Sequence, residues 1–141
     1  MNEPCFYGFP VYGENGAKAA QDVGGEEVTA DTRSFEPNPA NTQRVHNFLK
    51  KYIPTALGPI IYSKTCLYTM PPDRDFVIDA LPGYDNCFIA IGAGHAFKFA
   101  SLIGKILSEL AIDGATESNI QPFKFDRPIL RMENPPKSFM L

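Results

Sequence analysis

Residues 87–110 of the chain read CFIAIGAGHAFKFASLIGKILSEL. The run Cys87–Ile91 is apolar and predicts a β-strand, which Gly92 and Gly94 interrupt. Large apolar residues then recur at the spacing of one helix face: Phe99, Leu102, Ile103, Ile106, Leu107 and Leu110. Gly114 is placed to end this helix. A strand, a glycine turn and a helix follow one another in nucleotide-binding units, so this order predicts an α/β fold.

The glycine turn does not match a dinucleotide-binding fingerprint. In the pattern GxGxxG the third position must be small, and here it is Phe97. The acidic residue expected roughly 20 residues later would be Asp113, which lies at the predicted helix end and not after a strand. No Walker-type Gly-Lys-Ser/Thr follows. A helix start beside Lys98 still favours negative charge, although glycines that merely permit a helix start are the simpler interpretation.

The rest of the chain predicts an antiparallel region joined to this strand–helix unit, in a mixed α+β arrangement. The expected elements are a hairpin of residues 5–13 and 16–25, a helix at 38–52, strands at 59–70 and 76–82, and a short extended segment at 123–130. Small residues recur every fourth position at Ala96, Ala100, Gly104 and Ser108. We expect this stripe to let the second helix lie close to a sheet.

Composition narrows the class of protein. The chain has 141 residues, 44% of them hydrophobic, and a formal net charge of -3 without a basic stripe, which argues against nucleic acid as a partner. No apolar segment reaches the roughly 18 residues of a membrane span. Cys5, Cys66 and Cys87 are odd in number and form no CxxC pair, so we expect neither a disulfide framework nor a metal site. A cytoplasmic location is the default expectation.

Two further motifs indicate a family. The stretch KTCLYTMPPDRDFVID, residues 64–79, resembles the Cys-x-Tyr-Thr-x-x-Pro-Asp segment of the monomeric sarcosine oxidase and N-methyltryptophan oxidase family, which are FAD-dependent amine oxidases. Residues 94–99 resemble the Gly-His-x-Phe-Lys-Phe segment of the same family. The stretches YGFPVYGENGAKAA (7–20) and FDRPIL (125–130) also match in order and spacing. Several motifs in the right order are far more specific than one alone.

The resemblance implies that the chain corresponds to the last third of a family member. Members are nearly three times as long and have a dinucleotide fingerprint near the amino terminus, which this chain lacks. Residues 1–75 would then be the end of the substrate domain and residues 76–130 the carboxyl-terminal strand–helix segment of the FAD-binding domain. Residues 131–141 would form a loose tail. The implied fold is a partial FAD-dependent oxidoreductase fold with antiparallel substrate-domain strands.

The resemblance also assigns residues to the cofactor. Cys66 matches the cysteine that holds the flavin covalently by a thioether. Gly94, His95 and Ala96 match the turn whose helix start faces the flavin pyrimidine ring, where negative charge develops on reduction. Lys98 follows one turn later. The alternative for Cys66 is a small residue that fills a gap in the core, the usual role of a lone cysteine.

Catalytic residues follow from the same matches. Lys98 corresponds to the lysine that pairs with the substrate carboxylate, and Tyr7 and Tyr68 to aromatic residues around the substrate. Lys18 corresponds to the lysine that promotes the reaction with oxygen. Ordinary packing for Tyr68 and a solvated lysine for Lys18 remain alternatives. Asp22 stands where some members have histidine, so the choice of substrate stays open.

The implied function is oxidation of a secondary amino acid by FAD and oxygen, giving an imine and hydrogen peroxide. The six apolar residues of the second helix would face little without the missing amino-terminal half. We therefore expect the chain to need that half or to self-associate. The alternative is a truncated, non-catalytic domain that self-associates or pairs with another chain.

Overall fold

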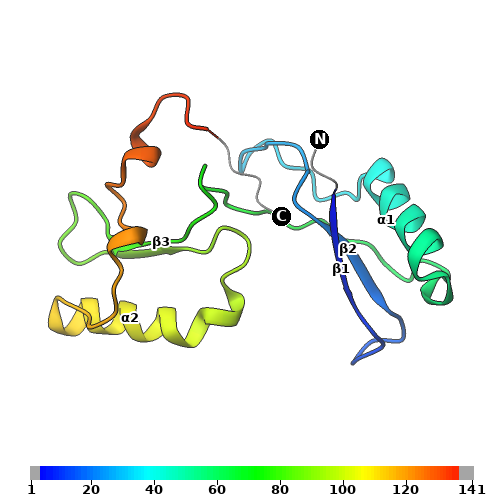
Figure 1. Cartoon of the computed structure of the whole chain (residues 1–141), viewed down its shortest axis with the longest axis horizontal. Coiled ribbons are helices and arrows are strands. Elements are labelled where there is room, and N and C mark those ends of the chain that lie inside the picture. The colour runs from blue at the N-terminus through cyan, green and yellow to red at the C-terminus, as the bar shows by residue number, and fades with distance from the viewer. Residues whose placement is uncertain (1–3, 137–141) are drawn as a thin grey trace. The chain divides into compact units, whose positions relative to one another are not determined.

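The structure is a computed structural model that describes residues 4–136 (Figure 1). These residues form two compact units, which meet in the sequence between Cys66 and Leu67. Each unit contains a two-stranded antiparallel sheet and one α-helix, so the predicted mixed α/β class is confirmed. Within residues 4–136, every helix is too short or too polar to cross a membrane.

The first unit is a hairpin with one helix. Strands β1 (Cys5–Phe9) and β2 (Lys18–Asp22) pair antiparallel, as predicted. Helix α1 runs over Pro39–Tyr52, also as predicted. It begins there because the Asn38 side chain accepts hydrogen bonds from the first free backbone N–H groups, at 2.8 and 3.3 Å, and because proline is favoured at a first helical position.

Aromatic contacts hold this unit together. The Phe6 ring of β1 stacks on the Phe48 ring of α1 with centroids 4.3 Å apart, and Phe48 contacts Tyr52 at 5.1 Å. No residue from 4 to 66 is buried. The hairpin and the helix therefore touch without enclosing a core.

The second unit encloses a small core. Strands β3 (Val77–Ala80) and β4 (Phe88–Ile91) pair antiparallel, and helix α2 (Ala100–Asp113) packs against both. The core is formed by Ile78, Ile106, Leu110 and Ile120. Gly114 ends α2 in the left-handed conformation (φ 72°), which confirms its predicted role.

Two predicted elements differ in the structure. Residues 59–70 form no strand, although their composition favours one. A strand is stabilised by a neighbour that satisfies its backbone groups, and in the described part of the chain both sheets are two-stranded and leave this segment out. Its residues Ile60, Ile61 and Tyr62 are 60–64% exposed. The second helix begins at Ala100 and not at Ala96, because a turn of 3₁₀ helix, Phe97–Phe99, precedes it.

The extended tail predicted at residues 123–130 is also wrong. Phe123 is the last residue of one short 3₁₀ helix, η3 (Gln121–Phe123), and residues 128–130 belong to another, η4 (Pro128–Arg131). Each has a proline in its first positions, and the fixed φ of proline suits a helical start. Of the tail predicted at 131–141, Arg131 belongs to η4, and residues 137–141 lie outside the described residues.

The small-residue stripe of α2 does not make the contact with the sheet. That contact comes from the large apolar residues Ile106 and Leu110. A Cβ atom on Gly104 would meet nothing within 4 Å. Three of its four residues, Ala96, Ala100 and Gly104, instead line an open apolar groove of about 350 Å³, together with Ala90 of β4. At Gly104 the expected close approach to the sheet is therefore not made by the described residues.

Candidate functional site

The predicted site residues lie on both units. Tyr7, Lys18 and Cys66 belong to the first unit, whereas Tyr68, Gly94, His95, Ala96 and Lys98 belong to the second.

The turn between β4 and α2 requires glycine at two positions, for two different reasons. Gly94 has φ +80°, a conformation that side chains disfavour. A Cβ on Gly92 would come within 2.4 Å of the Ala96 Cβ. The backbone N–H of His95 donates to the Gly92 carbonyl at 2.8 Å and closes the turn. Sequence reasoning rejected a dinucleotide loop here, and the structure gives these glycines a different role, which is to fold the chain back in a tight turn.

Tyr68 packs directly against this turn. A Cβ on Gly94 would lie only 2.6 and 2.7 Å from Cδ2 and Cγ of the Tyr68 ring, so the ring lies on the bare glycine backbone. Tyr68 is half-buried, while Gly94 and His95 are exposed. Tyr68 from the stretch 64–79 and Gly94 from the glycine turn, which are distant in the sequence, are thereby in contact within the second unit.

The imidazole of His95 has a defined hydrogen-bonding role. Its Nδ1 lies 3.0 Å from the Ala93 carbonyl oxygen. A carbonyl only accepts hydrogen bonds, so Nδ1 must be protonated for this contact to form. In the neutral ring, Nε2 is then an acceptor. The turn thus presents a hydrogen-bond acceptor beside its backbone amides.

Lys98 adds positive charge at the same end of the helix. Its side chain is exposed, and Nζ lies 5.5 Å from the Phe99 ring centroid. The first N–H groups of a helix have no intrahelical acceptor and carry partial positive charge. This end of α2 therefore suits an anionic ligand group.

On the first unit, Lys18 and Tyr7 come together on one face of the hairpin. Lys18 is paired with Phe9, and Tyr7 lies two residues before Phe9, so the three side chains share a face. Lys18 Nζ lies 5.4 Å from the Tyr7 ring centroid and 5.6 Å from that of Phe9, both within cation–π range. Tyr7 is 37% and Phe9 58% exposed. The hairpin thus holds a cation over an open aromatic surface.

Cys66 is an exposed free thiol, so it does not fill a gap in a core within this structure. The hydroxyl of the preceding residue, Thr65, donates to the Ser34 carbonyl at 3.4 Å and ties the segment to its own unit. An exposed thiol is accessible to a cofactor, which is the first requirement for a covalent bond.

Sequence reasoning missed an ion pair that supports the second unit. Arg127 Nε and Nη2 donate to the two carboxylate oxygens of Asp73 at 2.7 and 2.9 Å. These hydrogen bonds lower the pKa of Asp73 below its ordinary value. The available signal was only that both motifs, PPDRD and FDRPIL, contain Asp and Arg, and the sequence alone does not say which of these residues pair.

A second carboxylate makes a similar connection. Asp79 on β3 accepts from Lys124 Nζ at 2.7 Å and from the Phe125 N–H at 2.9 Å. Removal of Asp79 from water acts to raise its pKa, but these hydrogen bonds outweigh that effect and the pKa is lowered. Asp73 thus anchors the carboxyl-terminal segment to the residues just before β3, and Asp79 anchors it to β3 itself.

Comparison with known proteins identifies the family. Residues 7–110 match the family described as FAD dependent oxidoreductase. The chain belongs to this family. It is 40% identical over 131 residues to the monomeric sarcosine oxidase of Arthrobacter sp. (strain TE1826), with 91% of this chain and 34% of that protein covered. It is 37% identical over 130 residues to the N-methyl-L-tryptophan oxidase of Escherichia coli (strain K12), with 89% and 34% covered.

These matches confirm the resemblance to the sarcosine oxidase and N-methyltryptophan oxidase family. The chain spans about a third of the length of the curated relatives it matches. The described residues fit a flavin in two respects. The thiol of Cys66 is exposed, and in the turn Gly94 and His95 remain exposed although the Tyr68 ring packs against one side of Gly94. The roles of the individual site residues stay predictions.

Proposed function

We propose that this chain forms part of an FAD-dependent oxidase of secondary amino acids, of the sarcosine or cyclic amino acid type. The observation that supports this most is the packing of Tyr68 on Gly94, because it joins two predicted site residues, one expected beside the substrate and one in the flavin-facing turn. The relatives are named as oxidases of sarcosine and of N-methyl-L-tryptophan, which supports this substrate class.

In this proposal FAD is held covalently by Cys66 and faces the turn of Gly94, His95 and Ala96, with Lys98 beside it. Bound FAD supplies the redox chemistry, in which the C–N bond of the substrate is oxidised to an imine and oxygen is reduced to hydrogen peroxide. The amides at the start of the helix stabilise negative charge near the turn. The His95 Nε2 lone pair offers an acceptor to a donor group.

The remaining residues bind substrate and oxygen. Lys98 holds the substrate carboxylate by charge, and the rings of Tyr7 and Tyr68 flank the substrate. Lys18, held over Tyr7 and Phe9, provides a positive charge that stabilises the negative charge on oxygen as electrons reach it.

The organisation of the whole protein is part of the proposal. Residues 1–75 form the end of the substrate domain and residues 76–130 the last segment of the FAD-binding domain. The activity requires the further length that the relatives have, supplied by the same or another chain. We propose a cytoplasmic location, to which the three free cysteines are suited.

A chimera tests this function. This chain replaces the matching third of a monomeric sarcosine oxidase, and the purified protein is precipitated with acid. We expect a yellow pellet for the chimera and for Cys87→Ala, and a colourless pellet with free flavin for Cys66→Ala. Cys87 is the matched control because it is also an exposed free thiol. Flavin that stays attached in Cys66→Ala overturns the attachment site, and a folded chimera without any flavin overturns the function.

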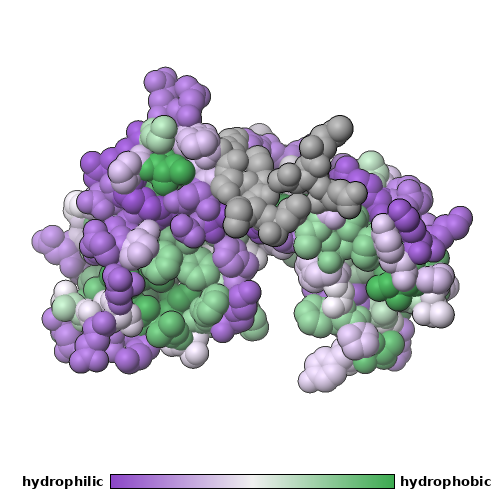
Figure 2. Space-filling model, in the orientation of Figure 1, coloured by the Kyte–Doolittle hydropathy of each residue, from purple (hydrophilic) through white to green (hydrophobic). Residues whose placement is uncertain are grey.

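A second candidate is a non-catalytic domain that self-associates. The open groove on α2 and the exposed apolar residues of both units favour it (Figure 2). Of the six apolar residues predicted on the α2 face, Phe99 and Leu102 remain 39% and 49% exposed. A colourless chain that runs as a dimer in size-exclusion chromatography with light scattering supports this candidate. A monomer without binding of hydrophobic dyes contradicts it.

A further inference from the structure

Arg127 joins the carboxyl-terminal segment to the stretch that leads into β3. Besides its two hydrogen bonds to Asp73, its Nη1 donates to the Phe76 carbonyl at 2.9 Å. The Arg127 side chain is 10% exposed and the Asp73 side chain 16%. With two longer bonds, from Nη1 to the Lys124 carbonyl and from Nη2 to the Asp75 carbonyl, both at 3.3 Å, five hydrogen bonds fix the planar guanidinium at a place where water competes little.

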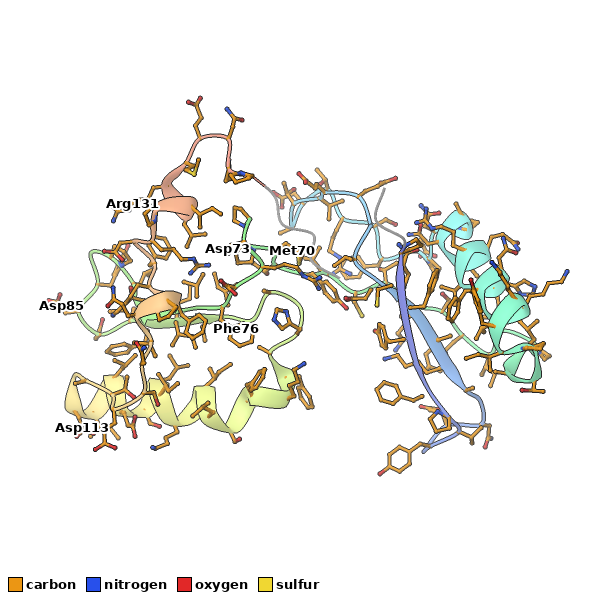
Figure 3. The ribbon with its side chains drawn as sticks, in the orientation of Figure 1. Met70, Asp73, Phe76, Asp85, Asp113 and Arg131 are labelled. Carbon is orange, nitrogen blue, oxygen red and sulfur yellow. The ribbon has the colours of Figure 1, made fainter. Side chains whose placement is uncertain are left out.

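Phe76 extends this anchor to the glycine turn. Its ring lies 4.9 Å from the His95 ring and 5.6 Å from the Phe99 ring, measured between centroids. Phe123 of η3 packs on it at 5.9 Å. Figure 3 shows Phe76 on the α2 side of β3, and Asp73 farther from α2. The carboxyl-terminal segment thus holds Phe76 twice, by its backbone through Arg127 and by its ring through Phe123.

From these contacts we infer that Arg127 is a positioning residue for the His95 turn and acts through Phe76. Close-packed side chains transmit a shift to their neighbours. When the hydrogen bond from Arg127 to the Phe76 carbonyl is lost, Phe76 shifts, and with it the ring against which His95 packs. The contact between His95 Nδ1 and the Ala93 carbonyl depends on that ring orientation. Arg127 thereby maintains Nε2 as the acceptor. Only the consequence for a flavin rests on the proposed function.

The tautomer of His95 is measurable in the chain itself. The chain has two histidines, and His46 lies exposed on α1 in the other unit, so it serves as an internal reference. Two-dimensional ¹H–¹⁵N NMR of the imidazoles, above the pH at which they are protonated, gives the ratio of Nδ1–H to Nε2–H for each ring.

For Arg127→Ala we expect the ratio of the Nδ1–H to the Nε2–H tautomer of His95 to fall about fivefold. This is the change that accompanies loss of one net hydrogen bond. His46 should not change. The matched control is Lys124→Ala, which breaks the other ion pair of the same segment, at 2.7 Å to Asp79. It should destabilise the unit without changing the tautomer ratio of His95.

Arg127→Lys and Asp73→Asn test the same inference if Arg127→Ala does not fold. Lysine keeps the charge and loses the planar fork, so we expect an intermediate tautomer ratio. An unchanged His95 in every folded Arg127 variant, or an equal change in Lys124→Ala, overturns the inference. Because this measurement needs no flavin, a chimera that fails to bind flavin leaves it standing, and an unchanged His95 leaves the proposed oxidase standing.

Discussion

Residues 67–136 enclose a small apolar core, whereas residues 4–66 have no buried residue. The second unit is closed by two carboxylates, Asp73 and Asp79, that bind residues about fifty positions away. The first unit is joined by the stacked rings of Phe6 and Phe48. Both units contain candidate site residues. Those of the second unit are supported by a core, and those of the first unit are not.

This difference indicates how each half is positioned. Tyr68, Gly94 and His95 are held by contacts within their own unit. The partners of Lys18 on the hairpin are themselves exposed rings. A catalytic group must be held rigidly to be effective. We therefore expect the hairpin to be supported, in the complete oxidase, by the additional length that the relatives have. Four experiments test this contrast.

The largest effect is expected from Lys18→Met in the flavin-loaded chimera. At about 4 Å and an effective dielectric constant near 20, one charge contributes roughly 4 kcal/mol, about a thousandfold in rate. Stopped-flow mixing with oxygen should show reoxidation slowed to that extent, and anaerobic reduction by substrate nearly unchanged. Lys50→Met, on exposed α1 of the same unit, is the control. Slower reduction with normal reoxidation would assign Lys18 to the binding of substrate and contradict its role in the reaction with oxygen.

Replacing a large apolar residue by alanine should destabilise the second unit more than the first. Ile106 is 4% exposed, and Ile106→Ala should cost the second unit about 2 to 5 kcal/mol, because it leaves a cavity. Phe48→Ala in the first unit should cost less, since Phe48 is half-buried and borders no core. Ile112→Ala, at an 80% exposed position of α2, is the control. Amide hydrogen exchange, read separately for each unit, measures these changes. Equal costs for Phe48 and Ile106 would contradict the contrast.

Lys98→Ala tests the ligand-binding end of α2. Loss of a charged contact should cost about 2 kcal/mol, or roughly thirtyfold in KM, at the low end of the usual range because Lys98 is exposed. The increase should appear for amino acids and not for amines without a carboxylate. Lys105→Ala, an exposed lysine that pairs with Glu109, controls for loss of charge. A similar increase in KM for both substrate classes would exclude the carboxylate contact.

The smallest expected effect is the loss of stability of the second unit at low pH. The pKa values of Asp73 and Asp79 are lowered in the folded chain, so their contribution to stability is complete above the ordinary value near 3.8. It is lost as the pH falls below that value and through the lowered pKa values. We expect the Tm of the second unit to fall by several degrees, about 4 to 8 °C per kcal/mol, over this range. Asp73→Asn should flatten the pH dependence. An unchanged slope in that variant would mean that other groups cause the fall.

Local signals predicted the elements whose ends are set by nearby residues. Helix α1 was predicted to its last residue because Asn38, Pro39 and Pro54 fix its ends within the segment. Gly114 did the same for the end of α2. The hairpin of residues 5–22 was predicted from an aromatic-rich first run, the glycine turn that ends it and the short run that follows. In each case the deciding contacts lie within a few positions in the sequence.

Contacts over long sequence distances were beyond this kind of reasoning. Residues 59–70 have the composition of a strand, but strand formation depends on a neighbour that a single segment does not reveal. The pair of Asp73 and Arg127 spans fifty-four positions, and no periodicity marks it. The roles of the site residues were named from the resemblance, although the local pattern had already drawn attention to the glycine turn and Lys98. The sequence contained no sign that the Tyr68 ring would lie on Gly94.

That contact predicts how the two positions tolerate substitution together. At Gly94 any side chain meets two separate penalties, the left-handed backbone at φ +80° and the Tyr68 ring 2.6 Å away. Reducing Tyr68 to alanine removes only the second penalty. Combined substitutions at the two positions should therefore be less harmful than the sum of the single ones, but never neutral. A library selected for folding should keep glycine at 94 almost without exception, and should accept other residues there mainly in combination with a small residue at 68.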